Sequence, residues 1–93
     1  MSTKKQNKHI YIGGKKYYRY LITWSDISGD STITDFNEFE KMKTSTIKTE
    51  AYIFKKTKLN IHTFSSYQDE DGEIGFGDRN IIPRSVIKNM VRS

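Results

Sequence analysis

The side chains in this sequence that are best suited to binding a ligand lie between residues 64 and 84. Arg79 follows the short segment Gly75-Phe76-Gly77-Asp78, and a guanidinium group can hold a phosphate through two parallel hydrogen bonds. The segment lacks the Gly-Lys-Ser/Thr ending and the following helix of a P-loop. An ion pair between Arg79 and a neighbouring carboxylate, such as Glu73, is the alternative interpretation.

Hydroxyl and aromatic side chains precede this segment at Ser65, Ser66 and Tyr67. A hairpin would bring them beside Phe76, where hydroxyls can donate hydrogen bonds and a ring can stack on a base for about 1–3 kcal/mol. An ordinary serine- and threonine-rich strand surface is the alternative. The candidate ligand-binding residues predicted from the sequence are Trp24, Ser65, Ser66, Tyr67, Phe76, Arg79 and Arg84.

No catalytic or metal-binding constellation is recognisable in the sequence. His9 and His62 are the only histidines, and neither has a second ligand at metal-binding spacing. The acidic run from Asp69 to Glu73 differs from an EF-hand loop, because its twelfth position is Asn80 instead of a bidentate glutamate. We therefore expect no catalytic residues, no metal site and no cofactor.

The charges of the chain are arranged in blocks around a net charge of +5. Residues 1–20 and 41–58 are rich in lysine, whereas residues 26–40 and 69–78 each contain five acidic residues and no basic one. Basic blocks can attract nucleic acid, although lysines also keep strand edges soluble. The residues that would contact a nucleic acid in this alternative are Lys4, Lys5, Lys8, Lys15, Lys16, Lys55, Lys56 and Lys58.

The length of 93 residues predicts a single small domain. The absence of cysteine excludes disulfides and cysteine zinc sites. No apolar run reaches the roughly 20 residues of a membrane span, and the basic N-terminus is not followed by the apolar segment of a signal peptide. We expect a cytoplasmic protein with a disordered basic arm over residues 1–9 and one domain over residues 10–93.

The first half of the domain predicts a strand and a short helix. Residues 16–24 alternate so that Tyr18, Tyr20, Ile22 and Trp24 share one face. Residues 35–43 predict a short helix that either Thr34 or Asp35 can cap, since Asp35 and Glu38 have the spacing of a capping box. Phe36, Phe39 and Met42 repeat at helical spacing. We expect this helix to lay Phe36 and Phe39 on the rest of the domain.

The second half predicts a series of short strands over residues 47–56, 59–67 and 74–82, with a hairpin turn at Asp71-Gly72. Pro83 would end the pairing, and residues 86–91 form either a strand or a short helix. The fold class that these elements predict is mainly β with one short helix, as a five-stranded antiparallel SH3-like or Sm-like barrel or a strongly bent sheet.

The first predicted strand ends in Trp24-Ser25-Asp26, and an aromatic helix, a strand pair and an acidic turn follow before the closing segment Ile82-Pro83-Arg84-Ser85-Val86-Ile87. With these features, residues 16–91 resemble a family of small bacteriophage-encoded proteins. The sequence departs from the pattern at Ile33, where a second tryptophan is common, and in its basic arm. Similar phage proteins include inhibitors of bacterial immunity that sequester cyclic nucleotide messengers in pockets between subunits.

Three functions are compatible with these observations. The resemblance implies a phage anti-defence protein, a homo-oligomer in the host cytoplasm that sequesters a cyclic oligonucleotide without catalysis. The basic blocks favour an Sm-like or SH3-like nucleic-acid-binding protein. The third function is a protein that binds and inhibits a host defence enzyme. None of the three requires an enzyme.

Overall fold

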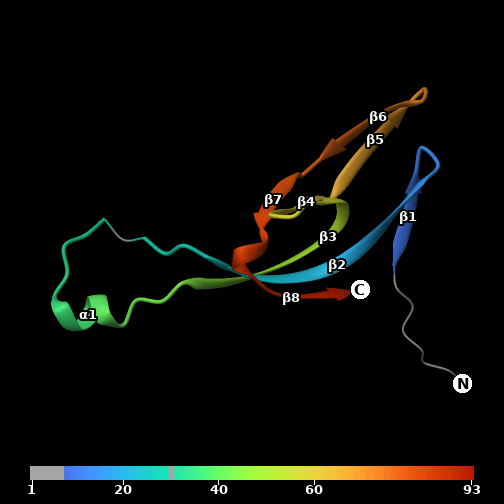
Figure 1. The fold of residues 1–93 in the computed structure, drawn as a ribbon. Helices are drawn as coiled ribbons and strands as arrows, with labels where there is room; N and C mark the ends of the chain where they lie inside the picture. Colours follow the sequence, from blue (N-terminus) through green and yellow to red (C-terminus); the bar gives the residue numbers. More distant parts are fainter. Residues whose placement is uncertain (1–7, 30) are drawn as a thin grey trace, which may run out of the picture.

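The computed structural model describes residues 8–29 and 31–93 and shows a mainly-β protein with one short helix, as the sequence predicts. The N-terminal segment of the predicted arm, residues 1–7, lies outside the described residues. Lys8 and His9 belong to the folded part, because the Lys8 amide donates a hydrogen bond to the Ser93 carbonyl and His9 begins the first strand. The elements in Figure 1 are β1 (His9–Ile12), β2 (Lys15–Asp26), α1 (Phe36–Glu40), β3 (Ser45–Lys56), β4 (Asn60–Phe64), β5 (Ser66–Glu70), β6 (Glu73–Gly77), β7 (Asn80–Pro83), η1 (Arg84–Val86) and β8 (Ile87–Arg92).

Six strands form one antiparallel sheet in the order β1-β2-β3-β4-β7, and β8 also pairs with β2. Strands β5 and β6 form a separate two-stranded hairpin. The sheets are open: among the described residues, β7 and β8 do not pair with each other, although only the single 3-10 turn η1 separates them. Of the two expected architectures, a barrel closed by hydrogen bonds is therefore not observed.

The core consists of two clusters, one on each face of β2. Tyr17 and Ile22 point to opposite faces, because they lie five positions apart in a strand whose side chains alternate. Tyr17 packs with Ile12 and Phe64, and Ile22 packs with Ile61 and Ile82. The predicted alternation of β2 is thus confirmed.

Two of the predicted strands are each divided by a short irregularity. Residues 59–67 form β4 and β5, which are separated at Ser65, and residues 74–82 form β6 and β7. Asp78 lies between β6 and β7 with φ of +49°, a left-handed conformation that interrupts a strand. The last apolar run is a strand, β8, preceded by η1.

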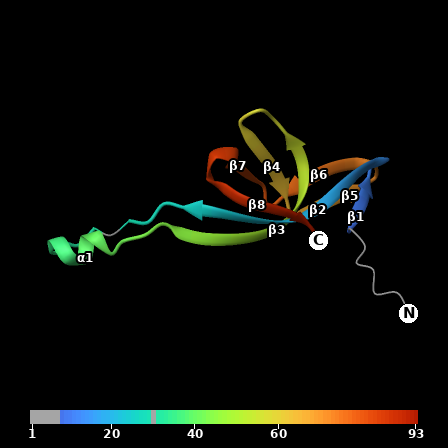
Figure 2. The same cartoon turned by 60° about the horizontal axis from the view of Figure 1, so that its bottom comes forward.

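The helix occupies a different place from the one expected. Of the two expected caps, Asp35 is the one used, with its Oδ1 accepting a hydrogen bond from the Glu38 amide. The helix is shorter than the expected 35–43 and ends at Glu40. However, Phe36 and Phe39 are 74% and 66% exposed, and α1 has no buried residue. Figures 1 and 2 show why: the chain between β2 and β3 extends far beyond the sheet and carries α1 at its tip. The prediction that these rings cover the domain is wrong.

Candidate ligand-binding pocket

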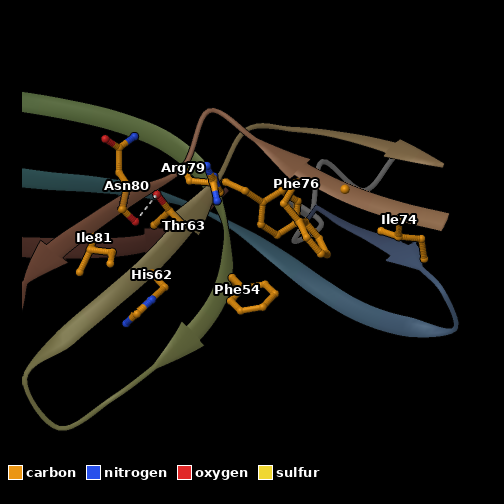
Figure 3. Close-up of a pocket in the computed structure, with 10 residues that line it drawn as sticks. Phe54, His62, Thr63, Ile74, Phe76, Arg79, Asn80 and Ile81 are labelled. Atoms are coloured by element: carbon orange, nitrogen blue, oxygen red, sulfur yellow. Dashed lines mark hydrogen bonds between the residues drawn. The ribbon is translucent and has the colours of Figure 1, made fainter. Parts of the chain in front are cut away.

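A pocket of about 520 Å³ lies between β3, β4, β6 and β7 (Figure 3). Its volume falls in the range of about 300–1,000 Å³ that is typical of small-molecule sites. Its walls combine aromatic rings, aliphatic side chains and a few polar groups. The lining residues are Phe54, His62, Thr63, Phe64, Ile74, Gly75, Phe76, Arg79, Asn80 and Ile81.

Packed phenylalanine rings form one wall of the pocket. The ring centroid of Phe76 lies 4.8 Å from that of Phe64 and 5.2 Å from that of Phe54, in both cases edge to face. Phe64 is 1% exposed and anchors the wall in the core, whereas Phe54 remains 42% exposed. The wall is therefore rigid at its base and offers an accessible aromatic surface at its rim.

A β-bulge in β3 places Phe54 at this rim. The pairing of β3 with β4 runs from Ile53↔Thr63 directly to Lys55↔His62, so Phe54 has no partner in the register. A bulge bends its strand and redirects the extra side chain, and bulges are common beside functional sites. Phe54 can thus contact Phe76 on the neighbouring hairpin.

Among the described residues that line the pocket, Arg79 is the only one with a cationic side chain. Figure 3 shows it between Phe76 on one side and Thr63 and Asn80 on the other. Arg79 follows the left-handed residue Asp78, is exposed, and forms no hydrogen bond or ion pair with any described residue. The ion pair considered as the alternative for Arg79 is therefore absent from the described part of the chain, and the guanidinium group is free to hold an anion.

The remaining polar side chains of the pocket are those of His62, Thr63 and Asn80. Thr63 is buried, and its hydroxyl donates a long hydrogen bond of 3.5 Å to the Asn80 carbonyl. His62 lies opposite Ile81 in the β4–β7 pairing. In the described residues, no group of three or more His, Cys, Asp or Glu side chains lies close enough together to hold a metal ion. The arrangement suits binding.

The predicted ligand-binding residues are divided by the fold into three locations. Phe76 and Arg79 line the pocket. Ser65, Ser66 and Tyr67 flank it: the Ser65 amide donates to the Gly77 carbonyl, Ser66 pairs with Gly77, and Tyr67 pairs with Phe76. The hairpin that the sequence predicts is present, but these three side chains do not belong to the pocket lining.

Trp24 and Arg84 lie elsewhere and have structural contacts. Trp24 packs against the Ile22 cluster, and its Nε1–H donates to Thr49 Oγ1 at 3.1 Å. Arg84 Nε donates to the Thr57 carbonyl at 2.8 Å, and the Arg84 amide donates to the Leu59 carbonyl. Arg84 thus fastens η1 to the turn between β3 and β4.

Of the residues that line the pocket, the predicted set contained only Phe76 and Arg79. The lining residues that sequence reasoning missed are Phe54, His62, Thr63, Phe64, Ile74, Gly75, Asn80 and Ile81. The β4–β7 pairing brings His62 and Ile81 together across a sequence separation that no local pattern encodes. The alternation of side chains in the sequence of β3 likewise did not predict the bulge at Phe54. Only the pairing of Phe76 with Tyr67 followed from a recognisable turn, Asp71-Gly72.

The lysines proposed for nucleic-acid binding do not all lie on one surface. Lys4 and Lys5 lie outside the described residues. The Lys8 backbone amide donates a hydrogen bond to the Ser93 carbonyl. The Lys15 ammonium lies 5.6 Å from the ring centroid of Tyr17. Lys16 and Lys56 approach Tyr18 and Tyr20, respectively. Lys55 and Lys58 are exposed near the β3–β4 turn.

Comparisons with protein-family models, curated proteins and solved structures found no match to this chain. Over the part of the chain that the structure describes, no helix has the length and apolar character needed to cross a membrane.

Proposed function

We propose that this protein binds a nucleotide-type ligand in the pocket between β3, β4, β6 and β7, without chemical change to the ligand. The observation that carries this proposal is the position of Arg79, an unpaired guanidinium group beside the accessible rings of Phe54 and Phe76. A phosphate can bind to the guanidinium bidentately while a base stacks on a ring. No nucleophile or acid–base pair is needed for such binding.

The ligand class that we favour is a cyclic oligonucleotide immune signal, sequestered by a phage-encoded anti-defence protein in the host cytoplasm. The support for this choice is the sequence resemblance described above together with the pocket chemistry. An SH3-like architecture is part of the same proposal: β8, β2, β3, β4 and β7 follow one another in the sheet, and a 3-10 turn connects β7 to β8. These strands would form the rigid frame of a binding module.

A second candidate, a protein-binding inhibitor of a host enzyme, is favoured by one separate observation. Ile33, Phe36 and Phe39 are exposed on the segment that projects between β2 and β3. Exposed apolar clusters commonly mark protein-interaction sites. In both ribbon views, the helix α1 on this segment lies far from β4, β6 and β7, the strands that contribute to the pocket (Figures 1 and 2).

Titration calorimetry of the full chain with cyclic di- and trinucleotides tests the pocket. We expect Arg79→Ala to weaken binding by about 10- to 150-fold, because a hydrogen bond to a charged group contributes about 1.5–3 kcal/mol. Folding should be unaffected, since Arg79 has no partner among the described residues.

Arg84→Ala is the matched control for Arg79→Ala. It removes the same charge five residues away but breaks the contact with Thr57. We expect unchanged affinity and a modest loss of stability. Equal loss of affinity in both variants, or no binding of any nucleotide by the wild-type protein, would show that the pocket assignment is wrong.

A further inference from the structure

A second surface of the molecule combines cations and aromatic rings on the face of β2 opposite to Tyr17. We call it the cationic–aromatic face, and its residues are His9, Tyr11, Lys16, Tyr18, Tyr20, Lys56 and Arg92. It lies outside the pocket, which none of these residues lines.

The strand register explains why these side chains gather. Tyr11 lies opposite Lys16, His9 opposite Tyr18, and Tyr20 opposite Arg92. Directly opposed residues share a face of a sheet, and positions 16, 18 and 20 of β2 share a face because successive side chains alternate. Strands β1, β2 and β8 therefore present one continuous row, about 13 Å long from residue 16 to residue 20 at 3.3 Å per residue.

Cations and rings alternate along this row. The guanidinium Cζ of Arg92 lies 3.9 Å from the ring centroid of Tyr18, and Arg92 Nε donates to the Tyr20 hydroxyl at 3.1 Å. The Lys16 ammonium lies 5.0 Å from the Tyr18 centroid and 5.8 Å from the Tyr11 centroid. The Lys56 ammonium lies 5.1 Å from the Tyr20 centroid.

The positive charge of this face is not neutralised by acidic side chains. Lys16, Lys56 and Arg92 form no ion pair with a described residue. The nearest ion pair along β2, between Arg19 and Glu50, lies on the opposite face because Arg19 alternates with Tyr18 and Tyr20. Lysine and arginine are cationic at neutral pH. Hydrogen bonding with Tyr18 raises the pKa of Lys16 further, and hydrogen bonding with Tyr20 raises the pKa of Arg92.

We propose that the cationic–aromatic face binds single-stranded nucleic acid, with phosphates held by Lys16, Lys56 and Arg92 and bases stacked beside Tyr11 and Tyr18. Rings interleaved with cations are the common arrangement of sequence-tolerant single-strand binders. Tyr11 is 62% exposed and can accept a base directly. The Arg92 guanidinium lies over the Tyr18 ring and Arg92 is exposed, so a base can stack beside this pair.

Single strands fit this face better than a duplex. In a duplex the bases are stacked on one another and cannot reach a ring on a sheet surface, so only the phosphates would bind. We expect little base preference at this face, because every base has a π surface that can stack on a ring. This site is independent of the pocket proposal. Tyr17 contacts the pocket residues Phe54 and Phe76 on one face of β2, whereas Tyr18 lies on the opposite face because successive side chains alternate.

Fluorescence anisotropy of a labelled oligothymidylate, an oligouridylate and a DNA duplex, measured with the full chain at several salt concentrations, tests the proposal. We expect both single strands to bind more tightly than the duplex. Tyr11→Ala should weaken single-strand binding by about 5- to 150-fold with an unchanged salt dependence. Arg92→Ala should also weaken it, and should reduce the slope of log K against log salt by about 0.7.

Two controls separate this face from other sources of binding. Lys58→Ala removes one exposed positive charge outside the face and should have a much smaller effect than Arg92→Ala. Arg79→Ala should leave single-strand binding intact, so failure of the pocket and failure of this face are distinguishable.

Several results would overturn the proposal. The first is an absence of single-strand binding by the wild-type protein, and the second is equal binding of the duplex. The third is equal loss in Lys58→Ala and Arg92→Ala. The fourth is binding that survives Tyr11→Ala and Arg92→Ala but disappears when residues 2–7 are deleted, because binding would then depend on the N-terminal segment. Thermal unfolding of each variant would confirm that it is folded.

Discussion

Arg79 and Arg84 show how residues of the same type acquire different roles within one short segment. The guanidinium group and the backbone amide of Arg84 donate hydrogen bonds to the carbonyl groups of Thr57 and Leu59, in the β3–β4 turn. Arg79 follows a left-handed residue that ends the strand and is left at the pocket with no partner among the described residues. The two arginines differ because the tertiary structure places backbone carbonyl groups within hydrogen-bonding distance of Arg84 but not of the Arg79 side chain among the described residues.

Tyr20 provides a prediction at the level of a single group. The hydrogen bond from Arg92 lowers the pKa of the Tyr20 phenol below its ordinary value of 10.0, with a smaller contribution from Lys56 and an opposing effect of burial. Arg92→Gln should raise this pKa again. The measurement is phenolate absorbance during a pH titration, with Tyr20→Phe subtracted to isolate the Tyr20 signal.

The same shift has a defined effect on stability. Between the lowered pKa of folded Tyr20 and the value near 10 of the unfolded chain, the unfolded state holds more protons. The free energy of unfolding should therefore gain a small contribution as pH rises through this window, and lose it as pH falls through the folded pKa. Identical titration of Tyr20 in the wild-type and Arg92→Gln proteins would contradict the contact.

The turn between β1 and β2 gives a prediction at the level of the element. Gly13 and Gly14 have φ of +57° and +81°, as a two-residue turn of type I′ requires. A Cβ atom at Gly13 would also lie 2.7 Å from Ile74 Cδ1, on the neighbouring hairpin. Gly13→Ala should lower the free energy of unfolding by at least about 1–2 kcal/mol, which is the cost of a left-handed conformation for an L-residue.

Gly29→Ala is the matched control, because Gly29 has neither a positive φ nor a neighbour within 4 Å of the added Cβ. Its effect should stay within about 0.5 kcal/mol. Both variants can be compared by urea denaturation. Equal stability of the two alanine variants would mean that the turn is not held in the conformation described.

Most elements could be predicted from the sequence, because alternation and turn chemistry are local properties. Residues 16–24 alternate as β2 does, and Asp71-Gly72 forms the predicted turn, with φ of +53° and +84°. The helix was found through its Asp35 cap. What local patterns did not reveal was the break at Asp78, the bulge at Phe54 and the exposure of Phe36, since each depends on what lies opposite in space.

The same limit applies to the two binding surfaces. Phe76 and Arg79 could be predicted because they belong to one turn-linked segment. Lys16, Lys56 and Arg92 come from three strands, and only the register of β2 with β8 brings Arg92 to Tyr20. Charge blocks counted along the chain therefore identified the lysines but not the aromatic residues between them.

At the scale of the whole molecule, the chain is much more extended than a compact domain. The Cα radius of gyration is 17.8 Å, whereas a compact chain of this length would have about 12 Å. The projection between β2 and β3 accounts for much of this difference (Figure 1). Its apolar side chains, including Ile27, Ile33, Phe36 and Phe39, contribute nothing to either core cluster.

An isolated small domain gains little from leaving several large apolar side chains in water, because each buried one would contribute about 1.5–3 kcal/mol. We therefore predict that the protein forms a homo-oligomer through this projection.

Sedimentation velocity should give a mass above the 10.9 kDa of one chain. The double variant Phe36→Ser and Phe39→Ser should shift it to a monomer with an unchanged circular dichroism spectrum, because neither ring packs on the sheet. A wild-type protein that stays monomeric at every concentration would contradict this prediction.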